Sequence, residues 1–201
     1  MALVNEARKF AYNFEPHTAS RAVSTALLAL PSSRLIGKHH ATQQQMRVEE
    51  PNTTYDDYRW CVTVRNPLDT LVTRWTKRDI RRYPTLLPYV EKFKHQSQSV
   101  LFGLDMWQTA DTFVWFEHLY EDVERLFDLT LPERDPIHVT KLKTKQWYEY
   151  YDKETFDVVF PLFKDYCDKF GYHYAWSKDG LLYCGVYRDV RESFIKHYGV
   201  L

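Results

Sequence analysis

The chain has 201 residues, which is enough for one globular domain with a sizeable core. Its composition, 44% hydrophobic and 27% charged without repeats or low-complexity tracts, excludes the disordered and fibrous classes. Lys and Arg number 27, as do Asp and Glu, and the resulting formal net charge of zero does not favour nucleic acid or a membrane surface as a partner.

The same inventory predicts a soluble, cytoplasmic protein. No apolar stretch approaches the ~20 residues that span a bilayer, and the first ten residues lack the pattern of a signal peptide. The three cysteines have no metal-ligand spacing, which fits a reducing compartment. We expect a single domain over residues 1–201, with residues 172–201 as a C-terminal extension packed on it.

The first elements in chain order are a strand over Lys9–Glu15 and a helix over Arg21–Leu30. The turn between them, Pro16–Arg21, is rich in small and hydroxyl residues. A strand, a tight turn and a helix form the arrangement in which backbone N–H groups cradle a phosphate. A plain turn capped by Thr18 or Ser20 is the alternative. The glycine-rich loop of ordinary nucleoside triphosphatases is absent.

A second strand, Arg34–Lys38, runs directly into His39 and His40. A base with a near-neutral pKa at a strand end suits proton abstraction from a hydroxyl, although surface or capping histidines are the alternative. The two histidines have no third metal ligand at a suitable spacing, so the sequence does not predict a metal site here. Residues Gln43–Tyr58 are polar and predict a mostly exposed connection that starts with a helical turn.

The segment Arg59–Arg82 is the most informative part of the chain. Its residues Trp60–Val64 predict a buried strand, and a helix begins at once because Asn66 suits the N-cap and Pro67 the first helical position. Arg65 lies at the carboxyl end of this strand, where open α/β sheets bind ligands. Thr73 lies about two turns into the helix on roughly the same side, so an anion could be held between the two residues. The alternative is that Arg65 is a surface cation and Thr73 an ordinary helix position.

The remaining elements continue the alternation of strands and helices. We expect helices over Pro84–His95, Leu119–Phe127, Asp152–Phe170 and from Asp189, and strands over Thr112–Phe116, Ile137–Val139 and Leu181–Tyr187. Lys141, Lys143 and Lys145 form a basic segment that is either a phosphate contact or simply solvated. The pattern predicts an α/β fold with a central, mainly parallel sheet flanked by helices.

Four stretches resemble, in the right order, the sulfotransferases that use 3′-phosphoadenosine-5′-phosphosulfate (PAPS), in particular the carbohydrate-type branch and its compact bacterial and viral relatives. Pro16–Val23 is similar to the family's 5′-phosphosulfate loop, and Gly37–Thr42 to its His-Ala-Thr segment. Val64–Trp75, with the letters VRNPLDTLVTRW, resembles the 3′-phosphate motif. Phe116–Leu119 and Tyr150–Tyr172 resemble its C-terminal half.

This resemblance implies a P-loop-like three-layer fold and transfer of a sulfuryl group from PAPS to a hydroxyl or amine acceptor, such as a carbohydrate, without a metal. His40 is implied as the general base, with His39 as runner-up. A cytoplasmic enzyme of this kind fits a bacterial or virus-infected host cell. The residues implied to bind PAPS, and its product adenosine 3′,5′-bisphosphate, are His17, Thr18, Ala19, Ser20, Arg21, Arg65, Thr73, Lys141 and Lys143.

The chain departs from the family pattern at three positions, of which Thr73, in place of the usual serine, keeps the hydroxyl. His17 replaces the loop lysine that faces the transferred group, where it is also a catalytic candidate, and an imidazole is a weaker cation at neutral pH. Thr70 stands where an arginine is common. Two alternatives therefore stay open: a nucleotide or small-molecule kinase, and a non-catalytic PAPS-binding homologue.

Overall fold

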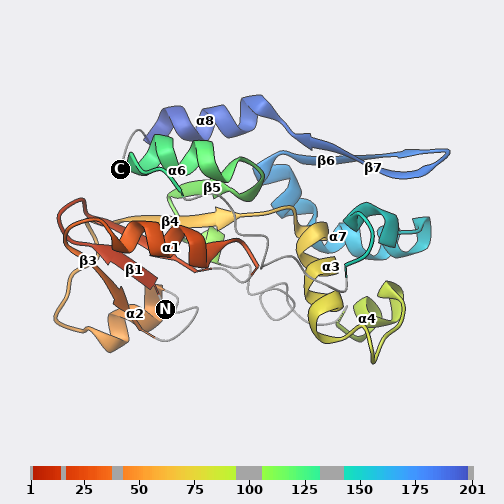
Figure 1. The fold of residues 1–201 in the computed structure, drawn as a ribbon, viewed down its shortest axis with the longest axis horizontal. Coiled ribbons are helices and arrows are strands. Elements are labelled where there is room, and N and C mark those ends of the chain that lie inside the picture. The colour runs from red at the N-terminus through yellow and green to blue at the C-terminus, as the bar shows by residue number, and fades with distance from the viewer. Residues whose placement is uncertain (1, 15–16, 38–42, 94–105, 132–142, 199–201) are drawn as a thin grey trace. The chain divides into compact units, whose positions relative to one another are not determined.

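The computed structural model describes residues 2–14, 17–37, 43–93, 106–131 and 143–198, which fall into two compact units (Figure 1). The first unit comprises Met1–Val64, Gly103–Glu133 and Phe194–Leu201, and the second comprises Arg65–Phe102 and Arg134–Ser193. None of the described helices is long and apolar enough to cross a bilayer.

The first unit is an α/β structure built on a five-stranded mixed sheet in the order β3-β1-β2-β4-β5. Its strands are β1 (Ala2–Asn5), β2 (Phe10–Asn13), β3 (Ser33–Ile36), β4 (Arg59–Val64) and β5 (Thr112–Trp115). Strands β2, β4 and β5 run parallel, whereas β1 pairs antiparallel with both β2 and β3.

The α/β class is thus confirmed, but the prediction of a mainly parallel sheet is wrong. Strand β1 was not anticipated, and it lies between β2 and β3 in the sheet. Only a four-residue turn, 6–9, joins β1 to β2, and a connection that short can link antiparallel strands but not parallel ones.

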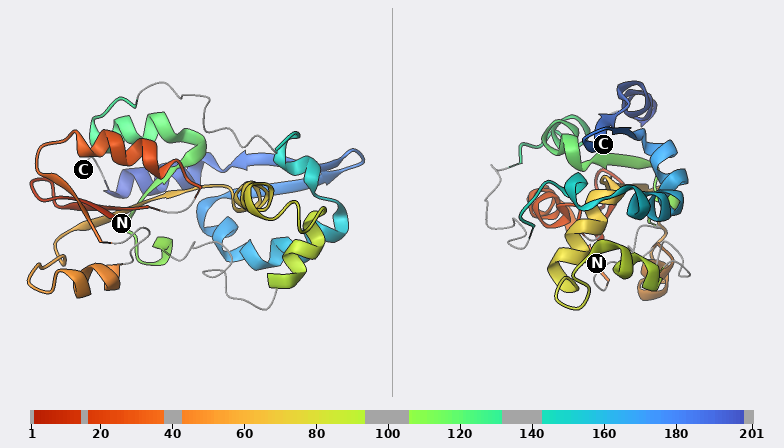
Figure 2. Two further views of the ribbon diagram at one scale, coloured as in Figure 1. Left: turned by 60° about the horizontal axis from the view of Figure 1, so that its bottom comes forward. Right: turned by 90° about the vertical axis from the view of Figure 1, so that its right-hand side faces the viewer.

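Helices cover both faces of this sheet, as Figure 2 shows in its left view. Side chains that alternate along β1, β2 and β4 form one apolar cluster with α1 (Ser20–Leu28) and α6 (Leu119–Phe127) and a second with α2 (Gln43–Glu49). Tyr12 and Phe10 belong to the first cluster, and Ala11, between them, belongs to the second. The described part of the unit also contains two short 3-10 helices, η1 (Met106–Gln108) and η2 (Phe116–His118).

The second unit is mainly helical and carries a hairpin (Figure 1). Its elements are α3 (Pro67–Arg78), α4 (Leu86–Phe93), η4 (Trp147–Tyr150), α7 (Lys153–Phe170) and the antiparallel pair β6 (Tyr172–Ser177) and β7 (Gly180–Val186). Helix α8 (Arg188–Tyr198) follows the hairpin.

The end of α7 shows how local sequence sets one of these boundaries. Gly171 is its C-cap with φ 75°, a conformation that favours glycine, so the predicted helix end is confirmed. A Cβ atom at this position would lie 3.2 Å from the Tyr187 backbone nitrogen and 3.2 Å from Val190 Cβ. Gly171 therefore provides both the turn and the close approach of the segment that follows β7.

Candidate functional site: the Asp69 cluster

The start of α3 has the geometry that its sequence predicts. Asn66 is the N-cap, and its side-chain Oδ1 accepts hydrogen bonds from the backbone N–H groups of Leu68 (3.0 Å) and Asp69 (3.2 Å). Pro67 occupies the first helical position, where a missing N–H costs nothing. Thr70, at the position where the resembling family often has arginine, donates its hydroxyl to the Asn66 carbonyl oxygen at 3.0 Å. The helix start is thus fixed by short-range bonds.

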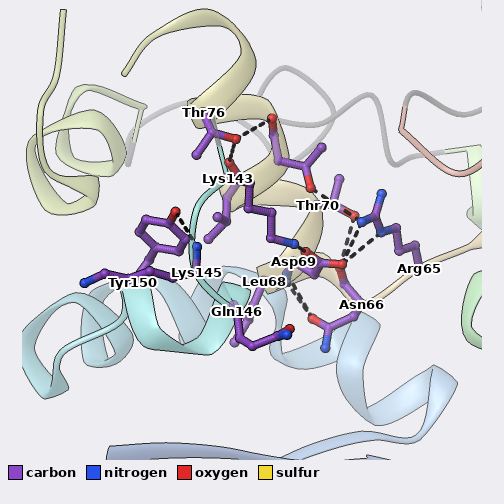
Figure 3. A network of polar contacts seen from close by, with 12 residues as sticks. Arg65, Asn66, Leu68, Asp69, Thr70, Thr76, Lys143, Lys145, Gln146 and Tyr150 are labelled. Atoms are coloured by element: carbon purple, nitrogen blue, oxygen red, sulfur yellow. Dashed lines mark hydrogen bonds and ion pairs between the residues drawn. The ribbon is translucent and has the colours of Figure 1, made fainter. Parts of the chain in front are cut away.

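Four side chains meet on one side of this helix and form what we call the Asp69 cluster: Arg65, Asp69, Thr73 and Lys143. Arg65 donates to Asp69 Oδ2 from Nη2 (2.6 Å) and Nε (3.2 Å), and its Nη2 also lies 3.4 Å from Thr73 Oγ1. Lys143 Nζ approaches the other carboxylate oxygen of Asp69 at 2.5 Å. Figure 3 shows the two cations converging on Asp69 from different sides.

The Asp69 cluster is largely withdrawn from solvent and carries excess positive charge. The side chains of Arg65, Asp69 and Lys143 are only 11%, 14% and 19% exposed. Burial opposes ionisation of Asp69, but the charges and hydrogen bonds of its two cations outweigh burial and hold its pKa below the usual value. One carboxylate therefore faces two cations, which leaves a net charge of +1.

The positive field continues along α3 to Lys77. Partial burial lowers the pKa of this ammonium group, and repulsion from Arg65 and Arg78 lowers it further. The spacing of Asp69, Thr73 and Lys77, four residues apart each time, places the three on one side of the helix. An anion bound at the Asp69 cluster would relieve this repulsion.

Three tyrosine hydroxyls hold the backbone and cap from which the Asp69 cluster projects. The hydroxyl of Tyr166 accepts from the Arg65 N–H (3.2 Å) and donates to the Arg65 carbonyl oxygen (3.3 Å). Tyr151 donates to the Leu68 carbonyl oxygen at 3.0 Å. Tyr174, in β6, donates to Asn66 Oδ1 at 3.0 Å.

In the first unit, the turn between β2 and α1 has an unusual backbone. The angle φ is positive at His17 (66°) and Ala19 (56°) but not at Thr18. An alternating sign of φ turns successive N–H groups toward one side, which is a known anion-binding conformation. Ala19, rather than Thr18 or Ser20, is the N-cap of α1, and no side-chain capping hydrogen bond is found at this position.

The predicted site residues are distributed as follows. Arg65, Thr73 and Lys143 come together, with Lys143 held by a carboxylate 74 positions away in sequence. His17, Thr18, Ala19, Ser20 and Arg21 form the β2–α1 turn and the first residues of α1. His39, His40 and Lys141 lie outside the described residues. Across the described ranges, no group of three or more His, Cys, Asp or Glu side chains is arranged to hold a metal ion.

Sequence reasoning missed Asp69 as a member of the site and missed all three tyrosines. The spacing of Arg65, Asp69 and Thr73 contains the signal for the first, because residues four apart on a helix can form ion pairs. The tyrosines carry no such local signal, since their partners lie 83 to 108 positions away.

Comparison of the chain with protein-family models, curated proteins and solved structures finds no match. The ligand of the Asp69 cluster is therefore argued from the chemistry of its side chains.

Proposed function

We propose that this protein is a PAPS-dependent sulfotransferase that transfers a sulfuryl group to a hydroxyl or amine acceptor, with carbohydrates as the first class to test. The observation that carries the proposal is the Asp69 cluster, in which Arg65, Lys143 and the Thr73 hydroxyl surround a single carboxylate at the start of a helix that follows a strand.

The donors of this cluster suit the 3′-phosphate of PAPS. A phosphate monoester carries about −1.5 to −2 charges at neutral pH and offers three acceptor oxygens. Arginine presents a planar fork of N–H donors to such a group, and lysine adds a compact charge. Thr73 supplies a hydroxyl donor next to Arg65. A cluster with net positive charge and low exposure favours an anion more than an exposed cation would.

The β2–α1 turn supports the second half of the proposal. In our proposal the fold is P-loop-like with three layers, and the backbone N–H groups of residues 18–21 bind the 5′-phosphosulfate. The positive φ at His17 and Ala19 supports this assignment. His17, when protonated, adds positive charge in the place of the lysine that the resembling family uses.

PAPS, when bound, supplies the sulfuryl group, and the protein positions and polarises the reacting groups. By analogy with phosphoryl transfer, the reaction depends on in-line placement and stabilisation of charge rather than on covalent catalysis. In the proposal Arg65, Thr73 and Lys143 hold the 3′-phosphate, Lys141 contacts the cofactor, and the β2–α1 turn holds the 5′ end. His40 takes the proton from the acceptor, and His39 is the alternative base.

The proposal is tested by thermal unfolding with adenosine 3′,5′-bisphosphate, 5′-AMP, and ATP with Mg²⁺ at equal concentrations. A ligand at a hundred times its Kd stabilises the folded state by about 2.7 kcal/mol, which is a clear shift of the transition. We expect the bisphosphate to give the largest shift, and sulfate transfer from PAPS to follow in an acceptor screen. A larger shift with ATP and Mg²⁺ would support a kinase instead. Binding of the bisphosphate without transfer to any acceptor would support a non-catalytic homologue.

A further inference from the structure

We infer that the C-terminal β6–β7 hairpin is a positioning element for the Asp69 cluster, and that Tyr174 is the residue through which it acts. This inference rests on the proposed function, because it concerns how tightly the cluster holds a 3′-phosphate. It gives a role to a part of the chain in which sequence patterns show no chemistry.

The link runs through the N-cap of α3. Asn66 Oδ1 accepts three hydrogen bonds, from the N–H groups of Leu68 and Asp69 and from the hydroxyl of Tyr174 at 3.0 Å. The backbone donors fix the carboxamide relative to the first turn of the helix. The Tyr174 hydroxyl is a donor from outside that turn, 108 positions away. The orientation of the helix start is therefore tied to β6.

The ring of Tyr174 is itself held firmly. It lies 5.8 to 6.1 Å, centroid to centroid, from the four rings of Trp147, Phe156, Phe160 and Tyr183, at angles from 38° to 84°. Rings packed on several sides in this way leave the hydroxyl little freedom to swing. Burial also raises the pKa of this hydroxyl well above 10, so it remains a donor throughout the physiological pH range.

The consequence falls on Arg65 and Asp69, which flank the N-cap. A site that binds a phosphate specifically must hold its hydrogen-bond donors within about 0.5 Å of the productive geometry. Arg65 already has both backbone groups bonded to Tyr166, and Asp69 has its N–H bonded to Asn66. Loss of the Tyr174 bond would loosen Asn66, then the first turn of α3, and finally the carboxylate that sets the two cations.

The test is Tyr174→Phe, which removes the hydroxyl and retains the ring. The quantity to measure is the ratio of the Kd values for 5′-AMP and adenosine 3′,5′-bisphosphate by titration calorimetry, because this ratio isolates the 3′-phosphate. We expect the ratio to fall about three- to tenfold, as for loss of one hydrogen bond, with the Kd for 5′-AMP unchanged. Tyr187→Phe is the matched control: Tyr187 follows the same hairpin, is 55% exposed and stacks on His173, and its ratio should stay at the wild-type value.

A second variant keeps the test decisive. Asn66→Ser retains an N-cap side chain but is too short to reach Tyr174. We expect Asn66→Ser to lower the ratio as well. The double variant should lower it no more than the more severe single variant does, since both substitutions remove the same hydrogen bond between Tyr174 and Asn66.

An unchanged ratio in Tyr174→Phe, even with a lower melting temperature, would overturn the inference and leave Tyr174 a purely structural residue. Additive losses in the double variant would overturn it too. If the wild-type protein does not prefer the bisphosphate, the proposed function itself fails and the inference fails with it.

Discussion

Replacement of Asp69 by asparagine separates the two roles of the cluster, which are to stabilise the fold and to bind an anion. Asp69 forms ion pairs with both Arg65 and Lys143. Asp69→Asn would leave two cations facing each other at 11% and 19% exposure. The cluster would change from a net charge of +1 to +2.

The magnitude follows from burial. Loss of one partner from a fully buried ion pair costs about 3–5 kcal/mol, and an asparagine that keeps one acceptor oxygen in a slightly exposed site reduces this to about 2–3 kcal/mol. For a chain of this length each kcal/mol lowers Tm by about 2–4 °C, so we expect a drop of about 4–12 °C. Asp157→Asn is the control: its ion pair with Lys153 is exposed, at 55% and 63%, and should contribute about 0.3–0.5 kcal/mol.

The assay is thermal unfolding with and without added sodium sulfate, across pH 3–8. Sulfate should raise the Tm of Asp69→Asn more than that of the wild type, because the variant lacks the negative charge that Asp69 places between Arg65 and Lys143. The pKa of Asp69 is lowered in the folded state, so its contribution is present above the unfolded value of about 3.9 and is lost as the pH falls below it. The gap in Tm between the two proteins should therefore close below about pH 4. A variant within about 1 °C of wild type at pH 7, or equal shifts with sulfate, would refute this reasoning.

Three further outcomes are expected. Glu50→Gln should flatten the acid side of the curve of stability against pH. A hydrogen bond from Arg34 lowers the pKa of Glu50 from 4.5 to about 2, so the contribution of Glu50 to stability is lost as the pH falls through that range. An unchanged curve would contradict this. Gly171→Ala should lower stability by about 1–3 kcal/mol in thermal unfolding, because alanine at φ 75° is strained and its Cβ meets Tyr187. An unaltered Tm would show that the segment after β7 relaxes freely. His40→Ala should abolish sulfate transfer from PAPS while the Kd for adenosine 3′,5′-bisphosphate stays within about twofold, and surviving activity would place the base elsewhere.

The parts of the fold that sequence could predict are those set by neighbours in the chain. The β4–α3 junction is one: Asn66 and Pro67 determine the helix start, and the structure has the cap where the sequence predicts it. The C-cap at Gly171 is another. Strand β1 is the counterexample, since its four residues are too few to show a period and its pairing with β2 and β3 is non-local. The mixed character of the sheet follows from that one strand.

The candidate site divides along the same line. Arg65 and Thr73 could be paired from helical spacing, and the structure brings them together. Lys143 could be named only as part of a basic segment, because nothing in its neighbourhood reveals a carboxylate 74 positions earlier. Tyr174 was beyond reach altogether, since a single tyrosine in a strand gives no indication of which polar atom its hydroxyl meets.

The division of the first unit among three stretches of chain has a consequence for folding during synthesis. Strand β4 is complete at Val64, but its parallel neighbour β5 and helix α6 come only after the insertion of residues 65–102. Until then, β4 exposes an unpaired edge, and the apolar side chains of α1 lack half of their cluster. A nascent chain is thus open to mispairing over that interval, and a fragment cut at Val64 would be a poor folding unit. Dissection of this protein should not separate the three stretches of the first unit, 1–64, 103–133 and 194–201.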